Sequence, residues 1–110
     1  MKIVVYQSGG RYRRITLDGE FDAPAVRASE SELTAAMLDD ADVIIDLRQV
    51  PSIDASGMRL LLSEVSAHAD HGGKTVLLGV DAHTRRIFKA TGIDQLVPVC
   101  DELEEAVSRF

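Results

Sequence analysis

The start of this chain is rich in β-branched and aromatic residues, and apolar and polar residues then alternate over Tyr12–Leu17, which are patterns of β-strands. The opening stretch Lys2–Gln7 is rich in Ile, Val and Tyr, and the segment Ser8–Gly10 after it is a glycine turn typical of hairpins. Tyr12–Leu17 forms the second arm of this predicted hairpin. The glycine in Asp18–Gly19 predicts a bulge or bend, after which we expect the arm to resume as Glu20–Asp22.

The remainder alternates between helical and strand patterns. Compact apolar runs predict buried strands at Ala41–Leu47, Thr75–Val80 and Leu96–Val99. Predicted helices run from the capping segment Ser29–Glu32 to about Asp39, from after Asp54 to about Asp70 before Gly72–Gly73, from His83 to Thr91 before Gly92, and onward from Asp101. We expect Ala23–Ala28 to be irregular.

This order of elements predicts an α/β fold. Right-handed crossovers between successive strands favour a mixed, mostly parallel sheet of about five strands with about four helices. The length of 110 residues fits one domain over residues 1–110.

The helix after Asp54 shows two faces when residues are spaced by about 100°. The predicted core face consists of Met58, Leu61, Leu62, Val65 and Ala69. The opposite stripe contains Ser56, Arg59, Leu60, Ser63 and Ala67. Leu60 is therefore expected to be an exposed apolar residue, either an ordinary surface leucine or part of a docking surface that includes Arg59 and Ser63.

Ser56 lies in the first turn of that helix, where free N–H groups and the helix dipole favour negative charge. Asp54 can cap the helix. A phosphate on Ser56 would be tolerated there and would add about −1.5 to −2 charges to the stripe. Arg59 could pair with that phosphate, although the sequence favours a solvated surface arginine, and Ser56 has a structural interpretation as a first-turn hydroxyl.

Composition restricts the kinds of partner and the cellular location that we expect. The formal net charge of −6 repels phosphate backbones and anionic lipids, so we expect neither nucleic acid nor a membrane as a partner. The one cysteine cannot form an internal disulfide, and no apolar run is long enough for a membrane helix. The N-terminus does not resemble a signal peptide, and we expect a cytoplasmic protein.

Motifs for catalysis are missing from the sequence. It contains no G-x-S-x-G segment, no phosphate-binding P-loop and no dinucleotide fingerprint, so we expect neither enzymatic activity nor a cofactor. His68 and His71 have a spacing that can hold a metal, but no further ligands complete a site. We therefore expect both histidines to be solvated and no metal to be bound.

The segment Ile53–Met58 leads from a strand region into a helix and resembles the phosphorylation motif of anti-sigma factor antagonists, whose fold is called STAS. Gly19–Asp22 looks like the Gly-Glu-Leu-Asp segment of that family, and Val43–Leu47 resembles its central strand. Gly92–Asp94 and Leu103–Ala106 are similar to its C-terminal end, so the resemblance covers nearly the whole chain.

The resemblance implies partner switching. An unphosphorylated antagonist binds an anti-sigma factor, which is also a serine-protein kinase of the histidine-kinase-like ATPase type, and is released when that kinase phosphorylates it. A serine phosphatase reverses the modification. Ser56 takes the acceptor position, Gly57 the motif glycine, and Asp54 and Asp22 the acidic residues near the same helix end.

Two positions depart from the family pattern. Ala55 stands where relatives often have a serine, which leaves Ser56 as the acceptor, and Arg59 stands where a second glycine is common. Two other functions remain open: an accessory STAS subunit of a transport complex or signalling scaffold, in which Ser56 is structural, and a small-ligand sensor. Phosphate transfer to Ser56 would distinguish the first from an antagonist, and ligand-dependent stabilisation would reveal the second.

Overall fold

The computed structural model describes all 110 residues and begins with the predicted hairpin. Strand β1 (Lys2–Ser8) pairs antiparallel with β2 (Tyr12–Asp18). The Arg11 N–H donates to the Ser8 carbonyl at 2.7 Å across the turn. Gly9 and Gly10 have φ angles of 50° and 80°, a region that glycine occupies without steric cost.

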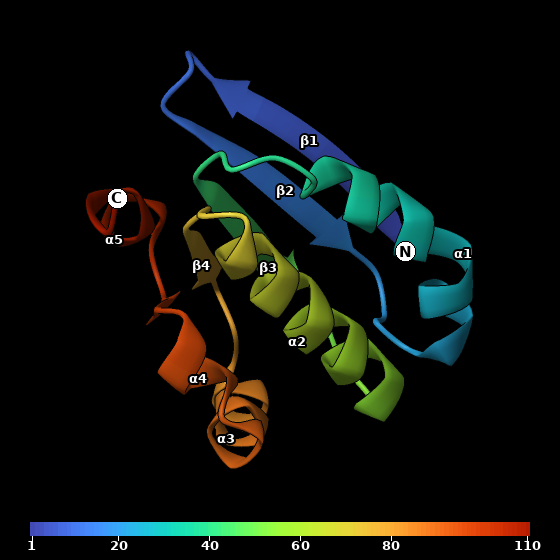
Figure 1. Ribbon diagram of the computed structural model, residues 1–110. Coiled ribbons are helices and arrows are strands. Elements are labelled where there is room, and N and C mark those ends of the chain that lie inside the picture. The colour runs from blue at the N-terminus through green and yellow to red at the C-terminus, as the bar shows by residue number, and fades with distance from the viewer.

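The five strands form one sheet in the order β1-β2-β3-β4-β5. The other strands are β3 (Val43–Gln49), β4 (Thr75–Leu78) and β5 (Val99–Cys100). Each pair from β2 to β5 is parallel, and β1 alone runs antiparallel to its neighbour. The predicted α/β class and mixed, mostly parallel sheet are confirmed (Figure 1).

Five helices accompany the sheet, one more than predicted. They are α1 (Ala23–Ala36), α2 (Ala55–Asp70), α3 (Ala82–Thr91), α4 (Ile93–Leu96) and α5 (Leu103–Ser108). The extra helix, α4, is a single turn that begins directly after Gly92, so β5 starts later than the predicted strand at Leu96. No helix combines the length and apolar character needed to cross a membrane.

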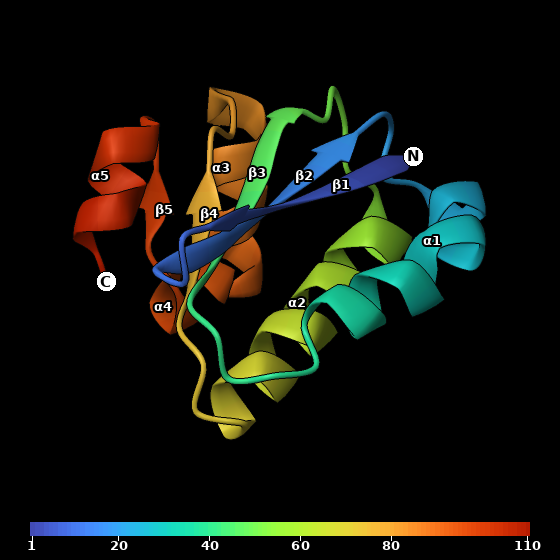
Figure 2. The same ribbon diagram turned by 90° about the horizontal axis from the view of Figure 1, so that it is seen from above.

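Both faces of the sheet are covered, but unequally. Helices α1 and α2 lie side by side against one face, and α5 lies beside β5 (Figure 2). The main core lies under α1 and α2 and uses alternate strand residues such as Ile45 and Leu77. A smaller cluster uses the intervening residues Ile44 and Val76 and packs against α5. Because β3 is covered on both faces, all five residues from Val43 to Leu47 are buried.

The start of α1 differs from the prediction. Ala23–Ala28 forms the first turns of this helix instead of an irregular segment. The Asp22 carboxylate accepts a hydrogen bond from the Ala25 N–H at 3.0 Å, and Pro24 lies in the first turn, where its missing N–H costs nothing. Ser29, expected near the cap, is instead buried inside the helix and donates to the Met1 carbonyl at 3.3 Å.

The second hairpin arm ends at an irregularity, as the glycine predicted. The pairing of β2 with β3 shifts register between Thr16 and Asp18, and Gly19 has a φ of 118°. Beyond it, Phe21 forms an isolated parallel bridge with Ile53 instead of extending the arm against β1. This bridge joins the segment before α1 to the segment before α2.

Candidate functional site

Two chain segments meet where α1 and α2 begin. The Phe21 N–H donates to the Ser52 carbonyl at 3.0 Å, and the Asp54 N–H donates to the Phe21 carbonyl at 3.1 Å. These reciprocal hydrogen bonds fix the two helix starts beside each other. The residues predicted at the site from distant parts of the sequence are therefore brought to one end of the molecule.

The Asp54 carboxylate links both helices. Its Oδ1 accepts from the Gly57 N–H at 2.9 Å, which caps α2 as predicted, and its Oδ2 accepts from the Ala23 N–H at 3.2 Å, at the start of α1. Asp22 caps α1 immediately beside it. The structure thus places Asp22, Asp54 and Gly57 together at the end of α2 that carries Ser56.

Ser56 is the second residue of α2 and is partly exposed. The N-terminal cap comes from Asp54, and the Ser56 hydroxyl forms no hydrogen bond within the chain. The structural reading, in which this hydroxyl helps to terminate the helix, therefore has no contact to support it.

Gly57 faces the segment before α1 at very close range. A Cβ atom at this position would overlap the Phe21 carbonyl oxygen and would lie 2.8 Å from the Phe21 Cδ1 atom. The same carbonyl accepts the Asp54 N–H, so it cannot move away without breaking the junction. Glycine is needed here for close packing.

The expectation that Leu60 is exposed is wrong, because its side chain is only 7% exposed. Helix α2 packs against the sheet and also against α1, so it buries a second stripe that the two-faced pattern does not reveal. This stripe consists of Leu60, Glu64 and His68. Conversely, Ala69, predicted to lie in the core, is exposed, whereas Met58, Leu61 and Val65 are buried as predicted.

His68 is also buried, contrary to the expectation of a solvated side chain. It is 1% exposed, and its ring nitrogens lie 3.3 Å from the Met37 carbonyl and 2.7 Å from the Ala41 carbonyl. His71 is exposed as expected. No group of three or more His, Cys, Asp or Glu side chains is arranged to hold a metal ion.

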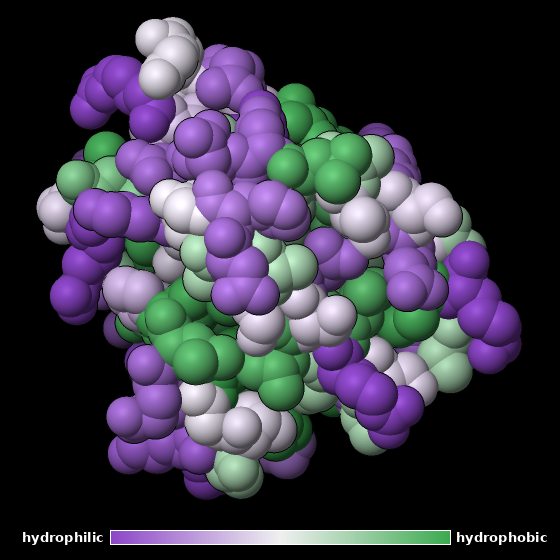
Figure 3. All heavy atoms as spheres, in the orientation of Figure 1, coloured by the Kyte–Doolittle hydropathy of each residue, from purple (hydrophilic) through white to green (hydrophobic).

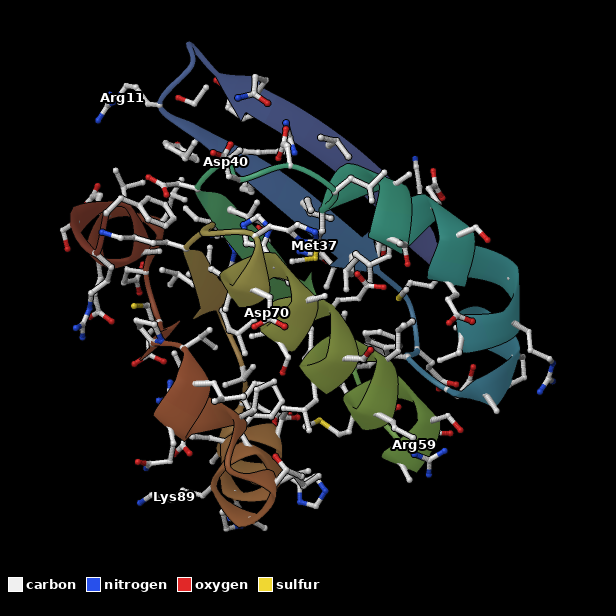
Figure 4. All side chains as sticks on the ribbon, viewed as in Figure 1. Arg11, Met37, Asp40, Arg59, Asp70 and Lys89 are labelled. Atoms are coloured by element: carbon white, nitrogen blue, oxygen red, sulfur yellow. The ribbon has the colours of Figure 1, made fainter.

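Arg59 and Ser63 are exposed, as predicted for the outer stripe of α2. They line a shallow groove between α1 and α2 together with Val26, Glu30, Ser56 and Leu60. Arg59 forms no ion pair, and it points outward at the end of α2 (Figure 4). Of the predicted docking residues, Leu60 forms part of the groove but presents little surface to solvent.

A second groove, of about 410 Å³, lies between α2 and α3 and was not predicted. Its lining comprises Ile53, Asp54, Ala55, Met58, Arg59, Leu62, Ile87 and Thr91. Apolar side chains gather on this face between α2 and the α3–α4 segment (Figure 3). Leu62 was assigned to the core and Ile87 lies on another helix, so only the fold brings them together.

Comparison with known proteins gives one consistent family. The model of the STAS domain matches residues 2–106. The anti-sigma-B factor antagonist of Staphylococcus aureus is 26% identical over 95 residues, which cover 86% of this chain and 88% of that protein.

Solved structures share the fold. An anti-sigma factor antagonist from Mycobacterium paratuberculosis superposes with a TM-score of 0.85 at 23% identity, over 98% of this chain and 92% of the other. The Bacillus cell fate determinant SpoIIAA in its phosphorylated form gives a TM-score of 0.73 at 24% identity, over 98% of each chain.

Proposed function

This chain belongs to the STAS domain family, and we propose that it is an anti-sigma factor antagonist controlled by phosphorylation of Ser56. In this proposal the unphosphorylated protein binds, in the cytoplasm, an anti-sigma factor that is also a serine kinase of the histidine-kinase-like ATPase type. Phosphorylation ends the complex, and a serine phosphatase restores binding. The chain acts as a binding module and not as an enzyme.

The observation that carries this proposal is the free, partly exposed hydroxyl of Ser56 in the first turn of α2. Its neighbour Asp54 already caps the helix, so modification of Ser56 need not break the cap. The S. aureus relative is named as an anti-sigma-B factor antagonist, and SpoIIAA, which shares the fold, has been solved in a phosphorylated form. The first name supports the antagonist role, and the second supports phosphorylation as a form of control in a protein of this fold.

A phosphate on Ser56 would change charge without changing fold. It would place about −1.5 to −2 charges beside the Asp54 carboxylate, at the rim of the groove between α1 and α2. Arg59, which has no carboxylate partner, is one turn away and can neutralise part of that charge. Before modification, Ser56 and Arg59 together carry a positive charge. After it, the phosphate and Arg59 together carry a negative charge, so a partner surface that fits the first state would be repelled by the second.

We propose that the partner covers Ser56, Arg59 and Ser63 and extends into the apolar groove between α2 and α3. The two grooves share Arg59, so one partner surface can contact both. Leu60 contributes to the floor of the first groove. An apolar centre beside a polar rim is the usual composition of a protein interface.

The binding test compares the affinities of Ser56→Ala and Ser56→Asp for a candidate anti-sigma factor whose gene lies beside the gene for this chain. Ser56→Ala should keep the affinity of the unmodified protein, and Ser56→Asp should weaken it at least tenfold, which corresponds to about 1.4 kcal/mol. Ser66→Asp is the matched control, because Ser66 is exposed on the same helix but lines neither groove. Equal affinities of the two Ser56 variants would contradict the switch.

The modification test measures intact mass after incubation with Mg-ATP and the same partner. One added phosphate in the native chain, and none in Ser56→Ala, is the expected result. If an active kinase adds no phosphate and Ser56→Ala retains full function in cells, the accessory STAS subunit becomes the better description.

A further inference from the structure

Strand β1 forms an open edge of the sheet (Figure 1). Three consecutive residues at its centre are among the most exposed large apolar side chains of the protein: Val4 at 47%, Val5 at 49% and Tyr6 at 50%. They lie outside the grooves assigned to the anti-sigma factor. This edge therefore needs a separate explanation.

The exposed side chains project from both faces of the sheet. Val5 pairs with Ile15, which is buried under the helices, so Val5 lies on the helix-covered face beyond the core. Tyr6 pairs with Arg14 on the opposite face, where the guanidinium carbon lies 5.1 Å from the centre of the Tyr6 ring. A partner packed on one face would leave half of this apolar surface exposed, whereas an added strand would cover both halves.

The edge also lacks the usual protection against strand pairing. Natural edge strands carry charges, prolines or bulges, but Ile3–Ser8 contains no charge and no proline, and the seven residues of β1 pair with β2 without a register shift. The opposite edge is different. Strand β5 has only two residues, follows Pro98, and is contacted by α5.

We propose that β1 pairs antiparallel with β1 of a second copy of this chain, so that two five-stranded sheets join about a twofold axis at Val5. Val5 is the central residue of Lys2–Ser8, so this register pairs the whole strand with its copy. Lys2 then lies opposite Ser8, and Val4 lies opposite Tyr6. No charged side chain of β1 faces a like charge, and an aromatic residue meets a β-branched one, which is a favourable cross-strand pair.

The dimer should be weak and dependent on concentration. A seven-residue edge is smaller than the roughly 800 Å² per partner of a standard stable interface. The net charge of −6 on each copy adds long-range repulsion, which salt screens. Dimerisation should therefore strengthen as salt rises from low to physiological concentration.

Sedimentation velocity over a wide concentration range tests the interface. The native chain should approach twice the monomer mass as its concentration rises, and Val5→Lys should raise the dissociation constant at least tenfold. Leu96→Lys is the control, since Leu96 is 57% exposed but lies in α4, far from β1 and near the opposite edge of the sheet. A native chain that stays monomeric, or a Val5→Lys variant that dimerises normally, would overturn the proposal.

Disulfide trapping tests the register. Directly opposed residues of an antiparallel pair have Cα atoms about 4.5–5.5 Å apart, which suits a disulfide. In a Cys100→Ser background, Val5→Cys should be cross-linked into a dimer by diamide far faster than Lys2→Cys, whose copy lies at the far end of the strand. Equal cross-linking rates would exclude a twofold axis at Val5, even if the protein is dimeric.

Discussion

At the scale of single residues, the site depends on one position where no side chain fits. Gly57 meets the backbone of Phe21, and that backbone is held in place by its hydrogen bonds to Ser52 and Asp54. The glycine of the motif thus has a packing role that is independent of phosphorylation. A larger residue must either push the two helix starts apart or distort the first turn of α2.

Gly57→Ala is therefore expected to lower the free energy of unfolding by about 1–3 kcal/mol, the usual cost of overpacking, although alanine is the better helix former. Urea denaturation measures this loss. Ser63→Ala, on the exposed side of the same helix, should change stability by less than about 0.5 kcal/mol. A stabilised Gly57→Ala protein would contradict the close approach of Phe21.

The buried ring of His68 is the basis of a second prediction about a single residue. Its ring nitrogens lie within hydrogen-bonding distance of two backbone carbonyls in the connection between α1 and β3, those of Met37 and Ala41, and a ring N–H can donate to a carbonyl there. His68→Leu replaces the imidazole with an apolar side chain of similar size that cannot donate, so the carbonyl that accepts from the ring loses its donor. We expect a loss of about 1–3 kcal/mol in urea denaturation, compared with little change for the exposed His71→Leu. Similar losses for both variants would argue against this role.

At the scale of elements, α2 is held from three directions. The sheet contacts one side, α1 contacts another, and the Asp54 carboxylate joins its N-terminus to that of α1. Contact with α1 includes a hydrogen bond from the Thr34 hydroxyl to the Glu64 carboxylate. Phosphorylation at Ser56 would therefore occur on a rigid element.

Asp54→Ala should lower the free energy of unfolding by more than the loss of an ordinary helix cap does. Asp81 is the matched comparison, because it caps α3 through the Thr84 N–H at 2.7 Å and bonds to no second helix. An N-cap is worth about 1 kcal/mol, so Asp81→Ala should lower the free energy of unfolding by about that amount. Asp54→Ala also loses the contact with Ala23 and should be more destabilising by calorimetry. Equal losses would show that the link between the helices contributes nothing.

Local patterns were sufficient to predict features that depend on neighbouring residues. The turn at Gly9–Gly10, the buried run of β3 and the cap at Asp54 all follow from such patterns. The burial of Leu60 did not follow, because it depends on α1 packing against α2. The early start of α1 was not predicted because its cap is Asp22, with Pro24 in the first turn, upstream of the serines that suggested a cap.

At the scale of the whole molecule, polar contacts join the hairpin to the helical layer. The Arg13 side chain on β2 contacts two other elements and the connection after α1: it donates to Gln7 on β1 at 3.1 Å, to the Ala36 carbonyl at the end of α1 at 2.9 Å, and to Asp39. The bond to Asp39 is bidentate, with distances of 2.9 and 2.7 Å. These contacts fix the free end of the hairpin, whose outer strand is the proposed dimer edge.

The contact between Arg13 and Asp39, and a second one between Arg48 and Asp46, predict how stability depends on pH. The hydrogen bonds from Arg13, assisted by the Ala41 N–H, lower the pKa of Asp39 to about 2. Burial alone would raise the pKa of Asp46, but the hydrogen bonds from Arg48 outweigh it and hold that pKa below its ordinary value. A carboxyl group whose pKa is lower in the folded protein stabilises the fold above its unfolded pKa of about 4, and this contribution disappears as the pH falls through the folded pKa.

Urea denaturation from pH 7 to pH 2 should therefore show stability falling below about pH 4, and Asp39→Asn should flatten part of this decline because its side chain cannot titrate. The Asp39 side chain is 51% exposed, so solvent screening limits its contribution to at most about 1 kcal/mol. Asp40→Asn is the control, since Asp40 is the adjacent exposed acid and forms no ion pair. If Asp39→Asn and Asp40→Asn follow the native profile equally, the ion pair of Arg13 does not stabilise the end of the hairpin, and the attachment of β2 to α1 must come from the core alone.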